Sequence, residues 1–257
     1  MRHNLTQVGV AAEKVPILSR TETATAAPAS SEAAGIAPHP RSIEVAGERL
    51  ELHPEGAIHW PRRSTLLVAD PHFGKDEHFR RAGVALPDGT LADDLARLDR
   101  LLAHTGAQRL VMLGDVVHAA PHPGATWPER VSAWRATHPS LEWRAVAGNH
   151  DRGFRAPSDW HLTWHDEALE APPFTLAHDP EPAHEGYVLA GHWHPVARLR
   201  VGGESARLPV FAFAERFAVL PAFGGFTGGA PIDDPSLQCY ALVDSRVIAL
   251  PRREVLG

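Results

Sequence analysis

Ser64-Thr-Leu-Leu-Val-Ala-Asp70-Pro-His72 decides the fold, because this apolar run stops abruptly at two side chains that can bind a metal. Four later runs stop in the same way, at Gly114-Asp115, at Gly148-Asn149-His150-Asp151, at His178 and at Gly191-His192-Trp193-His194. Short apolar runs bounded in this manner are typical of buried strands. Because the carboxyl ends of neighbouring strands face one crevice in an α/β sheet, we expect all five ends to meet in one place.

Helical patterns between the strands predict an α/β fold. Thr90 to Ala103 has leucines at helical spacing, and Pro128 to Thr137 begins with proline and glutamate, as a first helical turn often does. Ile43 to Leu52 alternates around a glycine and predicts a hairpin. Strands that alternate with helices form a sheet with right-handed crossovers, whereas the later strands are too closely spaced for helices between them. The sequence therefore predicts a second, partly antiparallel sheet.

The composition excludes several classes of protein. The formal charge of −6 over 257 residues gives no global positive field, so contact with nucleic acid would depend on local arginines and on bound metal. No apolar run reaches the length of a membrane span, and the N-terminus lacks the pattern of a secretory signal. The single cysteine, Cys239, is expected to be a small buried hydrophobe, and its isolation is typical of a reducing compartment. The sequence therefore predicts a cytoplasmic protein.

Residues 1–40 are expected to form a disordered N-terminal tail. The stretch from Thr21 to Gly35 is small, polar and punctuated by proline, and it cannot bury enough apolar surface to offset the entropy lost on ordering. Residues 41–257 contain all the expected strands and helices and have the length of one large domain. The sequence therefore predicts a tail followed by a single domain.

The order of the motifs, D-x-H, G-D-x-x-H, G-N-H-D, a lone His after a strand and G-H-x-H, resembles the calcineurin-like metallophosphoesterase superfamily. The resemblance spans roughly Ser64 to His194 and implies an α/β fold of two packed mixed β-sheets flanked by α-helices. It implies that one metal ion is held by Asp70, His72, Asp115 and His194. It implies that a second is held by Asp115, Asn149, His178 and His192, with Asp115 bridging the two. Hydrolysis of phosphate esters is the expected activity.

The residue types explain this chemistry. Carboxylate and imidazole together suit Mn²⁺, Fe²⁺ or Zn²⁺ better than Mg²⁺ or Ca²⁺. A bridging carboxylate such as Asp115 can hold two cations about 3.5–4 Å apart, and the neutral oxygen of Asn149 leaves the site with residual positive charge for a phosphate ester. In His192-Trp193-His194, alternate residues face the same side of an extended chain, so both rings are expected to reach the metals. Each motif alone has an ordinary explanation, since Gly-Asn-His-Asp is also a turn sequence and Asp-Pro-His also a helix cap. The five motifs together favour the metal site.

Three residues around the expected ligands are candidates for other roles. His150 would face the open side of the metals, where it could stabilise the pentacovalent phosphoryl group or protonate the leaving oxygen. Asp151 either orients the His150 ring or caps a turn, and the sequence leaves both roles open. His118 stands where the superfamily often has Asp, and it is a candidate to hydrogen-bond a ligand.

Further stretches resemble one subgroup, the bacterial ligase-associated DNA-damage-response phosphoesterase family. They are His72-Phe-Gly-Lys75, Phe79-Arg-Arg-Ala-Gly-Val84, Pro87-Asp-Gly-Thr90, Gly191-His-Trp-His-Pro195, Pro209-Val-Phe211 and Leu220-Pro-Ala-Phe-Gly-Gly-Phe-Thr-Gly-Gly229. This resemblance implies a Mn²⁺-dependent phosphodiesterase or endonuclease that cuts single-stranded DNA during repair, with a metal-bound hydroxide as nucleophile. It also implies an ATP-dependent DNA ligase, a helicase and an exonuclease as partners.

Candidate substrate contacts lie just beyond the first ligand pair. Lys75, Arg80 and Arg81 could receive phosphates that flank the scissile one, or could simply keep a helix surface solvated. Phe223 and Phe226, among glycines, could stack bases or pack the C-terminal strands.

Two other functions compete with DNA cleavage. One is a small-molecule or nucleotide/lipid pyrophosphatase or phosphatase on the same fold, and an apolar cap helix would favour it. The other is a non-enzymatic scaffold, which loss of the ligands would favour. The sequence contains no such helix, and every expected ligand position is filled.

Overall fold

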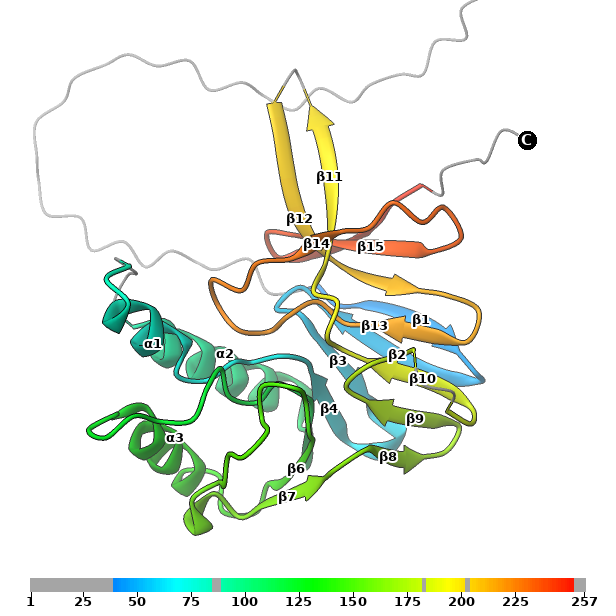
Figure 1. Ribbon diagram of the computed structural model, residues 1–257. Coiled ribbons are helices and arrows are strands. Elements are labelled where there is room, and N and C mark those ends of the chain that lie inside the picture. Colours follow the sequence, from blue (N-terminus) through cyan, green and yellow to red (C-terminus); the bar gives the residue numbers. More distant parts are fainter. Residues whose placement is uncertain (1–38, 85–88, 182–183, 202–203, 252–257) are drawn as a thin grey trace, which may run out of the picture. The chain divides into compact units, whose positions relative to one another are not determined.

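Two β-sheets pack face to face, and two α-helices of the described part of the chain cover the outer face of the first sheet (Figure 1). The computed structural model describes residues 39–84, 89–181, 184–201 and 204–251. All of them belong to one compact unit, Ile36–Gly257. The expected disordered tail of residues 1–40 therefore lies, except for its last two residues, outside the described residues.

The first sheet has seven strands that follow the order of the chain. Neighbouring strands from β1 through β4 are antiparallel, and neighbouring strands from β4 through β7 are parallel. The strands are β1 (Arg41–Val45), β2 (Glu48–His53), β3 (Ala57–Trp60), β4 (Thr65–Val68), β5 (Arg109–Leu113), β6 (Glu142–Val146) and β7 (Leu162–His165). The predicted hairpin and the first three predicted strands are all present. Their parallel pairing brings the carboxyl ends of β4, β5 and β6 to one edge.

The second sheet is mixed, as predicted. Along its main path the order is β14-β11-β12-β13-β10-β9-β8, with β15 paired to β12 and β16 to β15. Its parallel centre, β9-β10-β13, carries the two later ligand segments. The strands are β8 (Ala168–Ala171), β9 (Phe174–Ala177), β10 (Tyr187–Ala190), β11 (Pro195–Val201), β12 (Glu204–Phe213), β13 (Phe217–Val219), β14 (Ala230–Pro231), β15 (Gln238–Val243) and β16 (Arg246–Ala249).

Two of the helices, α2 (Thr90–Thr105) and α3 (Trp127–Ala136), pack on the first sheet through their apolar faces. A shorter helix is α1 (Lys75–Arg81), and short 3₁₀ turns lie at η1 (Pro61–Arg63) and η2 (Ser158–Trp160). The leucines of α2 and the aromatic rings of α3 bury themselves against β4, β5 and β6. Gly106 ends α2 in a left-handed conformation, which glycine adopts without strain. Both predicted helices are therefore present, within two residues of their expected bounds.

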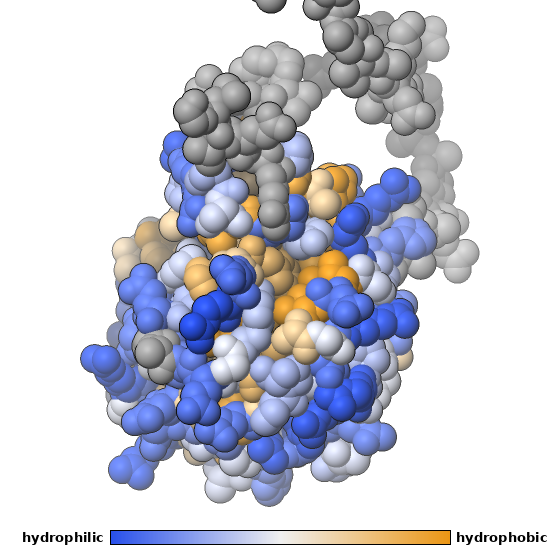
Figure 2. Space-filling model, turned by 90° about the vertical axis from the view of Figure 1, so that its right-hand side faces the viewer, coloured by the Kyte–Doolittle hydropathy of each residue, from blue (hydrophilic) through white to orange (hydrophobic). Residues whose placement is uncertain are grey.

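The two sheets share a second apolar core. Leucine, isoleucine and tryptophan from β2, β3 and β4 meet phenylalanine and leucine from β9, β10 and β12. This packing fixes the carboxyl ends of β9 and β10 opposite those of β4 and β5. Viewed from the right-hand side of Figure 1, the surface is largely hydrophilic around an exposed apolar area (Figure 2). Among the described residues, no helix is long and apolar enough to cross a membrane.

Candidate metal centre

The expected ligand residues stand directly after five strands of the two sheets. Asp70 and His72 follow β4, Asp115 follows β5, and Asn149 follows β6. His178 follows β9, and the pair His192 and His194 follows β10. The backbone N–H of Asp70 donates to the carbonyl of Gly114, and that of Gly191 donates to the carbonyl of His178, so the strand ends are tied to one another. The expectation that five distant segments converge is confirmed.

Two groups of side chains share Asp115. One consists of Asp70, His72, Asp115 and His194, and the other of Asp115, His178 and His192. Within each group, one ligating atom per residue lies within 4.8 Å of the others. Asn149 joins the second group, because its Oδ1 lies 3.0 Å from Nε2 of His178. The grouping has the same division between two ions that the family resemblance implied.

The donor atoms of these groups fit divalent metal ions. In the described part of the chain, Oδ1 of Asp70, Nδ1 of His72 and Nε2 of His194 are buried without a hydrogen-bond partner. Burial raises the pKa of Asp70, and burial followed by the charge of Lys75 lowers the pKa of His72 to about 2. A neutral imidazole is the form that binds a metal. A bound cation would give these buried oxygen and nitrogen atoms the partner that they lack.

Backbone carbonyls orient two of the rings. Nδ1–H of His178 donates to the carbonyl of Leu113 at 3.2 Å, which leaves Nε2 facing Asp115 Oδ1 at 3.6 Å. Nδ1–H of His194 donates to the carbonyl of Gly228 at 3.1 Å, which leaves Nε2 facing Asp70 Oδ2 at 3.4 Å. Metal-binding histidines usually hold their second ring nitrogen in this way. The two rings are therefore prepared to present Nε2 to an ion.

The backbone at the ligands is not extended. Asp70, His72, Asp115, His192 and His194 all have positive φ, between 45° and 69°. Residues with a Cβ rarely adopt this left-handed region, and such strain is characteristic of functional sites. The expectation that His192 and His194 face one side of an extended segment is therefore wrong. The chain turns at both residues, and each ring joins a different group.

Two glycines leave space for the ligands. A Cβ on Gly114 would overlap the ring of His178, and a Cβ on Gly148 would overlap the carboxylate of Asp115. These glycines are therefore required for close approach of side chains from neighbouring strands.

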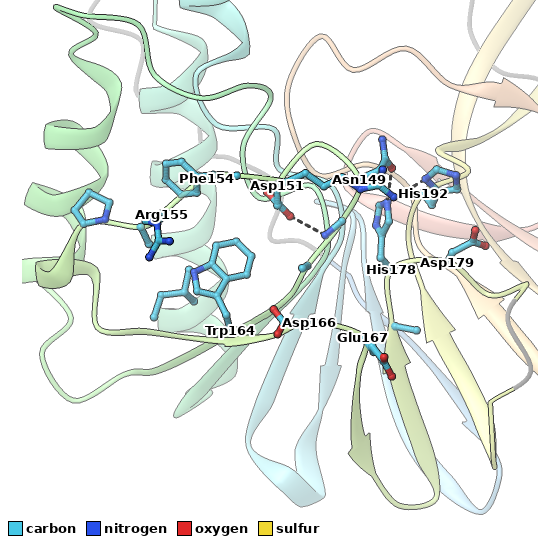
Figure 3. Close-up of a pocket in the computed structure, with 18 of the residues that line it drawn as sticks. Asn149, Asp151, Phe154, Arg155, Trp164, Asp166, Glu167, His178, Asp179 and His192 are labelled. Carbon is cyan, nitrogen blue, oxygen red and sulfur yellow. Dashed lines mark hydrogen bonds between the residues drawn. The ribbon is translucent and has the colours of Figure 1, made fainter.

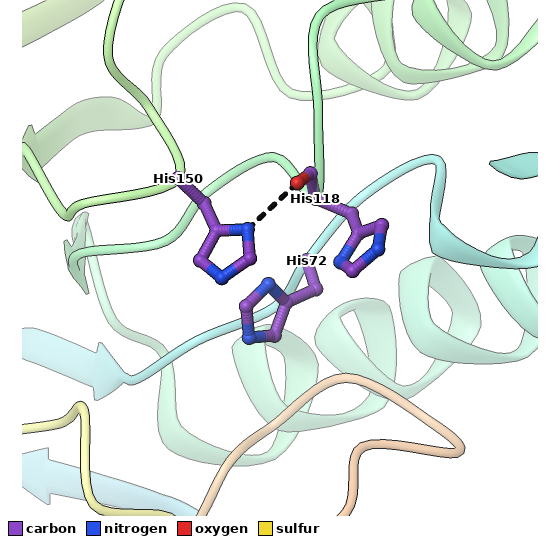
Figure 4. A group of neighbouring side chains, drawn as sticks. All are labelled: His72, His118 and His150. Carbon is purple, nitrogen blue, oxygen red and sulfur yellow. Dashed lines mark hydrogen bonds between the residues drawn. The ribbon is translucent and has the colours of Figure 1, made fainter.

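His150 is exposed and lies beside His72 and His118 (Figure 4). Its Nδ1–H donates to the backbone carbonyl of His118 at 2.8 Å, and its Nε2 lies 4.0 Å from Asp115 Oδ2. The ring of His118 stacks on that of His150, with centres 5.3 Å apart and planes 24° apart. His118 thus orients His150 through its backbone and by stacking.

Asp151 has a different role from the one expected for a catalytic partner of His150. Its carboxylate accepts the backbone N–H groups of Val116, Val117 and Gly148, at 3.2, 3.0 and 2.8 Å. The structure therefore favours the second of the two roles left open by the sequence. Asp151 fixes the turns that carry Asp115 and Asn149, and it is a positioning residue.

The three basic residues expected at the substrate differ in their position relative to the ligand groups. Lys75 is half-buried, donates to Thr227 Oγ1 at 3.2 Å, and its charge acts on Asp70 and His72. Arg80 pairs with Asp76 at 3.3 Å within α1, and Arg81 is exposed at the end of that helix. Lys75 is therefore the basic residue placed at the ligand groups, and a substrate role for the two arginines stays a prediction.

The two phenylalanines of the C-terminal loop divide between the two roles considered. Phe223 is buried in the core beneath the helices, where the guanidinium of Arg97 lies 4.0 Å from its ring centre. Phe226 is 59% exposed. Phe223 therefore packs the fold, and Phe226 is the one with a ring open to a ligand.

A cleft of about 1300 Å³ begins at Asn149, His178 and His192 (Figure 3). Its other end is lined by Phe154, Arg155 and Trp164, which the sequence analysis did not single out (Figure 3). The segment after Asp151 contains arginines and an aromatic residue close to a ligand motif. That combination is the sequence signal that could have indicated a substrate contact there.

Comparison with known proteins agrees with this geometry. No family model and no curated protein matches the chain. Among solved structures, nuclease MPE of Pseudomonas putida is 39% identical, and the match covers 82% of this chain and 100% of that chain with a TM-score of 0.73. Yfce, a phosphoesterase from E. coli, is 20% identical over 74% of this chain and 99% of that chain, with a TM-score of 0.40. The first match shows that the chain belongs to the calcineurin-like metallophosphoesterase superfamily and is a metal-dependent phosphoesterase.

Proposed function

We propose that this enzyme is a dinuclear-metal-dependent phosphodiesterase that acts as an endonuclease on single-stranded DNA in DNA repair. The observation that carries the proposal is the match to nuclease MPE, which extends over the whole of that protein. The sharing of Asp115 between two ligand groups supports two ions. We propose Mn²⁺ for both, with Fe²⁺ or Zn²⁺ as the alternatives that the same donor atoms accept.

The cleft supports a single strand as substrate. Trp164 and Phe154 are partly exposed in it, and aromatic rings of this kind stack unpaired bases without regard to sequence. Arg155 is exposed beside them and can receive a phosphate of the backbone. The net charge of −6 supports a short contact near the active site rather than an extended grip on a duplex. An ATP-dependent DNA ligase, a helicase and an exonuclease are proposed as partners in the same repair system.

The residues at the centre divide the work of hydrolysis. Asp70, His72, Asp115 and His194 would hold one ion, and Asp115, Asn149, His178 and His192 the other. When bound, the ions supply positive charge to the phosphate oxygens and lower the pKa of a water molecule. His150, held by the carbonyl of His118, presents Nε2 where it can protonate the leaving oxygen. Lys75 adds a positive charge beside the first group, which favours binding of an anionic diester.

Cleavage of end-labelled single-stranded DNA in the presence of Mn²⁺ tests the proposal. Products from the wild-type protein and none from Asp115→Ala would support it. An aryl phosphodiester assayed in parallel separates the two parts of the proposal. If the wild-type enzyme hydrolysed the aryl diester but left DNA intact, the metal centre would stand and the DNA substrate would be wrong. A small-molecule or nucleotide/lipid pyrophosphatase or phosphatase would then be the better hypothesis.

Arg155→Ala is expected to weaken binding of single-stranded DNA while hydrolysis of an aryl diester stays unchanged. The logarithm of the affinity falls linearly with the logarithm of the salt concentration, and loss of one phosphate contact to a single strand makes this slope shallower by about 0.7. The measurement is the affinity of the metal-loaded protein for labelled DNA at several salt concentrations. Arg130→Ala, which removes an exposed arginine from α3, is the matched control. Equal slopes for the two variants would exclude Arg155 from the path of the strand.

A further inference from the structure

A further group of potential metal ligands, separate from the residues of the active site, lies on the β2–β3 hairpin. It consists of Glu51, His53 and His59, and one ligating atom of each lies within 4.8 Å of the others. It shares no residue with the two groups around Asp115. We call these three residues the hairpin cluster. None of them has a part in hydrolysis as derived above.

Strand geometry brings the hairpin cluster together. Glu51 and His53 are two residues apart on β2, so their side chains project from the same face of the sheet. His59 on β3 is paired in register with Glu51. Ala57, the register partner of His53, packs in the core beneath the helices, so this face is the one that α2 covers (Figure 1). Glu51 Oε2 and His59 Nδ1 already lie 3.0 Å apart.

His53 has no role that its surroundings explain. Its side chain is fully buried, yet neither ring nitrogen has a hydrogen-bond partner in the described part of the chain. A buried imidazole normally finds at least one partner, because leaving both nitrogen atoms unpaired forfeits the interactions it makes with water. Burial, then the rings of His104 and His59, lower the pKa of His53 to about 4. The ring is therefore neutral at physiological pH, with a lone pair available to a cation.

The donor set and its spacing identify the class of ion. Two imidazoles and one carboxylate suit Zn²⁺ and neighbouring first-row ions. Zn²⁺ lies about 2.0–2.2 Å from such donors and is usually tetrahedral, so its ligand atoms lie about 3.4 Å from one another. The ligating atoms of the hairpin cluster lie within 4.8 Å of one another, and the side chains would draw together around a bound ion. His104, at the end of α2, has its ring centre 5.7 Å from that of His53 and stands beside the cluster.

We propose that Glu51, His53 and His59 bind a divalent ion of the zinc class, separate from the catalytic metals. The ion would tie β2 to β3 beneath the last turn of α2. Its expected effect is on stability. The three ligands take no part in hydrolysis, and they are brought together only in the folded protein, so the ion would bind the folded state in preference to the unfolded chain.

Metal content measured on the whole protein tests this proposal. The protein is stripped with a chelator, dialysed against Zn²⁺ and analysed by atomic emission. We expect Glu51→Gln and His59→Gln each to bind one equivalent of zinc fewer than the wild type. Glu44→Gln, which removes the same charge from an exposed position on β1, is the control and should match the wild type. Glu51→Gln should still hydrolyse an aryl diester, which shows that it folds.

A second measurement separates this ion from the catalytic ions. In the Asp115→Ala background, Zn²⁺ should still raise the midpoint of thermal unfolding, and adding Glu51→Gln should remove that rise. Equal zinc content in Glu51→Gln, His59→Gln and Glu44→Gln would overturn the proposal. So would a zinc-dependent rise in the midpoint that survives Glu51→Gln in the Asp115→Ala background.

Discussion

Asp115→Ala is expected to abolish hydrolysis and to release metal from both ligand groups. Asp115 is the residue that the two groups share, and only 2% of its surface is exposed. Its Oδ1 also accepts the backbone N–H of His150 at 2.9 Å, so the substitution removes a contact that places the proton donor. Metal ions contribute several kcal/mol to such reactions, and their loss should lower the rate by about 10³-fold or more.

The measurements are turnover of an aryl phosphodiester with Mn²⁺ and metal content after dialysis. Asp166→Ala is the matched control, because Asp166 is an exposed carboxylate that lines the same cleft. It should retain both activity and bound metal. If Asp115→Ala kept near-normal activity, the assignment of two ions bridged by this carboxylate would be wrong.

The convergence of the ligands on the first sheet could be predicted, because it depends on the order and parallel pairing of its strands. Each apolar run stops at a polar ligand, and parallel pairing of β4, β5 and β6 brings those ends to one edge. The periodicity of α2 was equally legible, since leucines at helical spacing leave one face to bury. Local patterns of this kind are sufficient for helices and buried strands.

Other features depend on tertiary contacts that no local pattern encodes. The carbonyl of His118 orients His150, and a backbone atom leaves no signature in the residue type. Asp151 was ambiguous for a related reason, because a carboxylate that binds backbone N–H groups looks the same in sequence as one that binds an imidazole. The left-handed backbone at His192 and His194 is imposed by the surrounding fold, whereas alternation in an extended strand was the local expectation.

The cleft illustrates a third limit of the sequence. Phe154 and Trp164 lie ten residues apart, on either side of a short 3₁₀ turn, and they come together only when that segment folds. Lys75, by contrast, follows directly on a ligand motif and was found. Substrate contacts close in sequence to a ligand motif could therefore be predicted, whereas residues that a longer loop brings to the cleft could not.

His150→Ala is expected to slow turnover by about 10²–10⁴-fold while metal stays bound, the range typical for loss of a general acid. His150 belongs to neither of the two groups that share Asp115, so metal content should not change. If the ring protonates the leaving oxygen, the loss should be large for a DNA alkoxide and small for a stable aryl phenolate. A comparison of the two substrates therefore reports the role of the ring.

His118→Ala is the control that makes this test specific, because it keeps the backbone carbonyl that accepts Nδ1–H of His150 and removes only the stacked ring. Its effect should be much smaller than that of His150→Ala. Loss of metal from His150→Ala would make His150 a ligand, consistent with its place beside His72 and His118 in a third set of donors at the active site. Equal losses on DNA and aryl diester with metal retained would instead assign His150 to stabilisation of the phosphoryl oxygens, since that contribution does not depend on the leaving group.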